Sequence, residues 1–258
     1  MRDKYFAVTL CCSSKNFRFL VLILLLAGAG AVSGRAQSLG FAPAPSRAKD
    51  AVSVRELQLS AKARGNFDHG LERLSKNDPE GSLKHFAAAI AVSPEYYEAY
   101  YHQGVAEAQL NRNQEALHSF QSAIDLSDGR YPRAEFGYAL MLTRIGSAAE
   151  AEPVVRHGLE TDDNISDGHV VLGLILLKLQ RVDEAERSAQ KALLLEQPSS
   201  AKGHLILADV EAARGEFAKQ AAELDAYLKS YPHDRNQKYL EAARDTARKL
   251  AARKAKGK

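Results

Sequence analysis

The sequence predicts an all-α protein: a right-handed superhelical solenoid of five helix–turn–helix repeats, closed by a C-terminal capping helix. Ala, Leu, Glu, Lys and Arg dominate the central part of the chain, and these residues favour helices. Runs of β-branched residues bounded by turn signals are nearly absent. Small residues recur at a spacing of 34 or 35 residues. Two helices of about 13 residues each, with their turns, account for that spacing.

The first 36 residues have the three parts of a secretory signal peptide. A basic leader is followed by an uncharged apolar run, residues 19–34, and by the small-residue pattern Gly34-Arg35-Ala36. A spanning helix needs roughly 20 residues and this run has 16, which favours cleavage after Ala36. We therefore expect a periplasmic or secreted protein. The alternative is a protein anchored to the inner membrane by residues 19–34.

The mature chain is expected to have no thiol and an uneven charge. Cys11 and Cys12 both precede the cleavage point, so no disulfide, cysteine nucleophile or cysteine metal ligand remains. Residues 37–258 have a net charge of −1, divided into −8 for residues 37–234 and +7 for residues 235–258. The expected molecule is an acidic body with a basic tail.

Residues 37–62 lead into the repeats. The stretch "QSLGFAPAPSRAKD" (37–50) is rich in Ala, Pro and Ser and predicts a flexible or extended linker. A short alternating apolar group follows at residues 52–59, and it could lie against the first helix.

The repeat domain spans residues 63–234 and keeps one register throughout. Its first small column is Gly70, Gly104, Ala139, Gly173 and Ala208. A second small column in the next helix is Ser82, Ala116, Ala151 and Ala185, and it is interrupted at Gln220. A third column, four residues after the second, is Phe86, Phe120, Val155, Ala189 and Leu224. The columns define units at 63–96, 97–131, 132–165, 166–200 and 201–234. Small residues let paired helices approach closely, and no unit can bury its apolar face alone, so the units must stack.

Residues 235–258 are expected to form a capping helix and a basic tail. One apolar face is predicted there, formed by Tyr239, Leu240, Ala243, Ala247 and Leu250. The basic charge could indicate nucleic acid, but export argues against that partner. A solvated cap is the first interpretation, and contact with an anionic membrane surface or envelope polymer is the second.

The repeat pattern resembles the tetratricopeptide repeat family. The best matches are "EAYYHQGVAEAQLNRNQEALHSFQSAIDLS" (98–127) and "GHVVLGLILLKLQRVDEAERSAQKALLLEQP" (168–198). The family often has a large aromatic residue four positions before the first small column. This chain has no Trp and carries Asn66, Tyr100, Glu135, His169 and His204 there.

Two apolar columns are expected to line the inner surface of the arc, because residues i and i+4 share a helix face. The proposed partner-binding residues are Phe67, Leu71, Tyr101, Val105, Phe136, Leu140, Val170 and Leu174. An exposed apolar strip of this size marks a binding surface. We expect a non-enzymatic scaffold or adaptor that binds an apolar or amphipathic protein or peptide segment in a concave groove. The alternative is that the protein covers the strip itself.

The crowded tyrosines Tyr96, Tyr97, Tyr100 and Tyr101 are interpreted as packing residues rather than as an aromatic ligand box. The resemblance also implies that a clamp for a peptide's C-terminal carboxylate is absent, since the Lys and Asn residues of such clamps are replaced by apolar side chains at these inner positions.

No catalytic or cofactor motif is predicted. The eight histidines never pair at i+3 or i+4, and there is no His-Glu-x-x-His run, so metal-ligand spacing is absent. The acidic turn around Asp162 and Asp163 lacks the glycine and distal glutamate of a calcium loop. Phosphate loops and nucleophile elbows are also missing. We expect no enzyme activity, no cofactor, no metal and no nucleic-acid partner.

Overall fold

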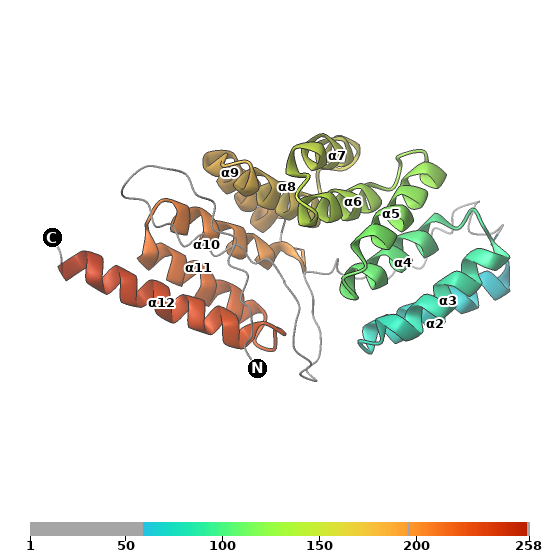
Figure 1. Cartoon of the computed structure of the whole chain (residues 1–258), viewed down its shortest axis with the longest axis horizontal. Helices are drawn as coiled ribbons and strands as arrows, with labels where there is room; N and C mark the ends of the chain where they lie inside the picture. Colours follow the sequence, from blue (N-terminus) through green and yellow to red (C-terminus); the bar gives the residue numbers. More distant parts are fainter. Residues whose placement is uncertain (1–58, 196, 257–258) are drawn as a thin grey trace, which may run out of the picture.

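The computed structural model describes residues 59–195 and 197–256, which fold into α-helices without a strand (Figure 1). The predicted leader, and the lead-in as far as residue 58, lie outside the described residues. The helices form five consecutive pairs and a final single helix, which confirms the predicted all-α solenoid. The pairs are α2 (Ala61–Ser75) with α3 (Pro79–Val92), α4 (Tyr97–Gln109) with α5 (Asn113–Ser127), α6 (Pro132–Arg144) with α7 (Ala148–Thr161), α8 (Ser166–Lys178) with α9 (Val182–Leu194), and α10 (Gly203–Ala213) with α11 (Phe217–Ser230). The short 3₁₀ helix η1 (Ser200–Lys202) precedes α10, and α12 (Gln237–Lys256) ends the stack.

The same tight turn joins the two helices of every pair. One residue of each turn has a positive φ angle, and these residues are Asn77, Asn111, Gly146, Gln180 and Gly215. The backbone N–H of the next residue donates to a carbonyl five residues earlier, over 2.8–3.0 Å. Glycine and asparagine tolerate this left-handed conformation, which ends a helix and reverses the chain. The five hairpins therefore share one turn chemistry, with Gln180 as the strained member.

Paired helices approach each other closely at the first small column. A Cβ atom added at Gly70 would lie 2.5 Å from the ring of Phe86, and one added at Gly104 would lie 2.9 Å from the ring of Phe120. Both phenylalanine rings are fully buried. The small residues are therefore required by the aromatic side chains that fill the space between the helices.

The first helices of successive pairs form an inner layer. Helix α4 contacts α6, α6 contacts α8 and α8 contacts α10. Among the described residues, the backbones of the second helices of successive pairs stay apart, and Arg156 of α7 reaches Glu184 of α9 only through the side chains, at 3.7 Å. The stack therefore curves with α2, α4, α6, α8 and α10 on the inside, and we call the surface formed by these helices the inner face.

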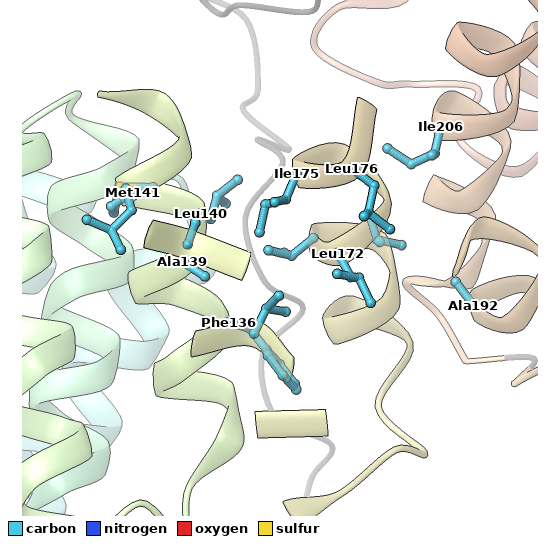
Figure 2. Close-up of a cluster of buried hydrophobic side chains, with 14 of the residues drawn as sticks. Phe136, Ala139, Leu140, Met141, Leu172, Ile175, Leu176, Ala192 and Ile206 are labelled. Carbon is cyan, nitrogen blue, oxygen red and sulfur yellow. The ribbon is translucent and has the colours of Figure 1, made fainter. Parts of the chain in front are cut away.

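The main apolar core lies in the seams between pairs. Figure 2 shows Phe136 and Leu140 of α6 beside Leu172 and Ile175 of α8, and all four side chains are almost completely buried. Smaller clusters lie at the two ends of the stack. This distribution is the one expected when each pair buries its apolar face only against its neighbours.

Helix α12 packs against α11 and closes the stack. Its buried residues are Leu240 and Ala247, two turns apart on one face. Tyr239 is 47% exposed, so including it in the predicted apolar face was wrong. It lies about 100° around the helix from Leu240. The basic tail is partly held against the acidic body, since Arg248 donates to Asp225 over 2.6 Å.

Candidate binding face

The apolar columns expected to contact a partner lie mostly inside the protein. Tyr101 and Phe136 have no exposed surface, Val105 keeps 4%, and Leu140 and Val170 keep 7% each. The other three predicted residues, Phe67, Leu71 and Leu174, are half-buried. The structure therefore corrects the expectation of an exposed apolar strip along the whole arc.

Tyr101 and Phe136 are buried because their rings fill the seam to the following pair. The ring of Tyr101 meets Tyr131, which precedes α6, edge to face at a centroid separation of 5.2 Å. The ring of Phe136 lies so close to α8 that a Cβ atom at Gly168 would be 2.5 Å from it. These two residues hold successive pairs together, and a partner cannot reach them in the packed state.

A row of charged residues lies three positions before the Phe67 column. It comprises Arg64, Glu98, Arg133, Asp167 and Lys202. Asp167 lies between two cations: its Oδ2 is 3.5 Å from Nη1 of Arg133, and its Oδ1 accepts a hydrogen bond from Nζ of Lys202 over 3.3 Å. The Arg133, Asp167 and Lys202 side chains keep 16%, 4% and 11% of their surface. We call these three residues the inner ion cluster. It lies on the inner face because it links α6, α8 and the start of α10.

Two cations flank one carboxylate in the inner ion cluster. Tyr101 lies beside it. Burial raises the pKa of Tyr101 well above its ordinary value and Tyr131 adds to the rise, while Arg133 opposes it. The Tyr101 hydroxyl therefore stays neutral, and the local field is set by the two cations and the carboxylate.

The opposite ends of the inner helices carry a second group of charges. Arg144, the last residue of α6, donates to the carbonyl of Ala108 on α4 over 3.1 Å. Burial raises the pKa of Asp209 on α10 to about 7, and Lys178 at the end of α8 opposes this rise. The charge that Asp209 places on the inner face consequently changes near neutral pH.

The prediction from sequence missed the inner ion cluster, although the signal is present. Its column reads Arg, Glu, Arg, Asp, Lys at the spacing of the repeat, so the charge alternates in sign from unit to unit. Alternation at this period places opposite charges on adjacent inner helices, where they can pair.

The described part of the chain contains neither a cluster of metal ligands nor a membrane-spanning helix. Within residues 59–195 and 197–256, no three His, Cys, Asp or Glu side chains come together in a way that could hold a metal ion. No helix in the same residues combines the length and apolar character needed to cross a membrane.

Stacked helix pairs with their first helices inside define a helical-repeat protein. The tetratricopeptide repeat family matches residues 67–131 and 170–235, which together make up half of the chain, and the protein belongs to this family. Members of the family are generally scaffolds for protein–protein interaction and are typically not enzymes. No curated protein matches the chain.

Solved structures share the fold at low sequence identity. A tetratricopeptide repeat protein of Thermus thermophilus, TTC0263, is 19% identical with a TM-score of 0.62, and the match covers 72% of this chain and 98% of that one. The Cut9–Hcn1 hetero-tetramer of the APC/C gives a TM-score of 0.66 at 16% identity, over 72% of this chain and 36% of that one. A repeat protein from Parabacteroides merdae gives a TM-score of 0.54 at 19% identity, over 76% of both chains.

Proposed function

We propose that the protein is an exported, non-enzymatic scaffold that holds a protein or peptide segment against its inner face. The general role of the family supports this function. The observation that carries it is the inner ion cluster, which places charged side chains at the amino-terminal ends of α6 and α8 and at η1, just before α10. Burying ionic groups costs desolvation energy, so stability alone is weak grounds for such a cluster, and we assign it a role in specificity.

The partner that best fits this face is an amphipathic segment. Arg133 and Lys202 offer charged donors to a carboxylate or to backbone carbonyls. Leu174 of α8, and Phe67 and Leu71 at the first pair, remain half-buried and can pack against apolar side chains. A segment that combines acidic and apolar residues would satisfy both groups.

Site-specific photocrosslinking in the cell envelope tests the binding face. A photoreactive amino acid at Leu174, on the inner face, should capture a partner. The matched control places the same group at Leu194, which is 78% exposed on the outer helix α9. Equal capture from both positions would contradict binding at the inner face.

A charge substitution provides an independent measurement. Leu174→Glu should abolish crosslinking from Leu71, while Leu194→Glu should leave it unchanged. Circular dichroism and a melting curve must show that both variants retain the helical fold. Crosslinking that persists in a folded Leu174→Glu variant would refute the assignment.

The second candidate is an assembly factor tethered to the inner membrane by residues 19–34. The apolar run of the leader favours this candidate if it stays uncleaved. The basic end of α12, with Arg253 and Lys256 exposed, would then face an anionic membrane surface. Mass spectrometry of the purified protein separates the two candidates, because a chain that begins at Gln37 has no tether.

A further inference from the structure

Two histidines from different helices lie side by side on the first pair. His69 belongs to α2 and His85 to α3, and their ring centroids are 5.6 Å apart. The sequence separates them by 16 residues, a spacing that matches no metal-binding motif. The antiparallel α2–α3 hairpin brings them together.

We propose that His69 and His85 form a binding site for a divalent ion of the late first-row transition metals, such as Zn²⁺ or Cu²⁺. Imidazole nitrogen suits both ions as a ligand. Two imidazoles that bind one ion through nitrogens at about 2.0–2.1 Å, at a tetrahedral angle, have centroids roughly 5–6 Å apart. The observed separation of 5.6 Å lies within this range.

A carboxylate lies near one of the two rings. Nδ1 of His69 lies 3.7 Å from Oε2 of Glu72, one turn further along α2. Nζ of Lys76 donates a hydrogen bond to Oε1 of Glu72 over 2.6 Å. Metal-binding histidines commonly direct their second nitrogen to such a carboxylate. This arrangement leaves Nε2 of His69 as the nitrogen for the ion.

The position of the two rings in the stack leaves them open to solvent. Within the described residues α2 contacts only α3 and α4, so this pair ends the stack. In the fourth pair, Leu172 occupies the repeat position of His69 and Ser188 that of His85, and both of these side chains are buried. The His69 side chain is 65% exposed. The two imidazoles supply two ligands, and water or a group from a partner completes the coordination.

Zn²⁺ titration by isothermal calorimetry tests the site. The protein is the untagged full-length chain carrying Cys11→Ser and Cys12→Ser, which removes both of its thiols. It should bind one ion per chain. His69→Ala and His85→Ala should each weaken binding by at least about tenfold, since each removes one of two ligands. His118→Ala, at an exposed position on α5, is the matched control and should leave the affinity unchanged.

Electron paramagnetic resonance of bound Cu²⁺ gives a second readout. Nitrogen couplings should indicate two imidazole ligands in the parent chain and one in each single variant. Circular dichroism establishes that the variants are folded, which is expected because both changes are at the surface. Absence of a bound ion, or a parent-like affinity and nitrogen signature in folded His69→Ala and His85→Ala, would overturn the proposal.

Discussion

Gly137→Ala tests whether glycine is required by packing between successive pairs. Gly137 lies on α6, and a Cβ atom there would be 2.6 Å from the ring of Phe120 on α5 of the preceding pair. Gly104 faces the same ring from α4, where a Cβ atom would be 2.9 Å away. Phe120 is fully buried between these two glycines, so its ring has little room to turn away.

The expected magnitude is the difference between two opposing effects. Alanine in place of glycine inside a helix contributes about 1 kcal/mol of stability. Adding a methyl group to a filled core costs about 1–3 kcal/mol. The contact of 2.6 Å is far inside van der Waals distance and the ring is enclosed, so the cost should lie at the upper end. We expect Gly137→Ala to lower the free energy of unfolding by about 1–2 kcal/mol.

Urea denaturation followed by circular dichroism measures this change. Gly65→Ala is the matched control, because Gly65 lies inside α2 with open space around its Cβ position. It should raise the free energy of unfolding by up to about 1 kcal/mol. Adding Phe120→Leu to Gly137→Ala should recover part of the loss, since the smaller side chain leaves room. Equal stabilisation by both glycine substitutions would refute the packing argument.

Three further predictions follow from individual side chains. Asp167→Asn should lower the free energy of unfolding in urea by about 2–4 kcal/mol, because it removes the carboxylate that Arg133 and Lys202 share. An unchanged denaturation midpoint would show that the inner ion cluster does not contribute to stability. Gln180→Gly should raise the free energy of unfolding by about 1 kcal/mol in the same assay, because a residue with a side chain is strained at the positive φ angle of this position. A loss of stability would contradict this prediction. Burial lowers the pKa of His102 from 6.5 to about 3. Between these two pH values the unfolded chain binds a proton that the folded chain excludes, so the free energy of unfolding should fall as the pH drops from 6.5 to about 3. His102→Gln should flatten the pH profile by up to about 1.4 kcal/mol per pH unit, and an identical slope in both proteins would count against it.

The fold was predictable because local spacing determines it. The small column from Gly70 to Ala208 keeps the repeat length through five units, and each pair of helices depends only on its own hairpin and its neighbours. The turn column from Asn77 to Gly215 keeps the same spacing and strengthens the register. Interactions of this kind appear in the sequence as periods, so the architecture follows from them.

The binding face was harder to predict because it depends on small rotations of side chains. Tyr101 and Phe136 belong to the inner helices α4 and α6. The ring of Tyr101 nevertheless packs against Tyr131, just before α6, and the ring of Phe136 packs against α8, so both rings lie in the seams between pairs. Periodicity gives the column of a residue but not the direction of its side chain between two neighbouring helices. The contact between His69 and His85 was missed for a related reason. The two residues belong to different columns on the two helices of one hairpin, and periodicity does not say which columns meet.

The contacts between the first helices have a mechanical consequence. The inner layer runs from α2 to α10, and each second helix also packs against the first helix of the next pair. Tension on the two ends of the stack would therefore lengthen the arc only by opening the apolar seams between pairs. Extension of the molecule costs apolar burial at every seam, so the stack should resist stretching along its whole length.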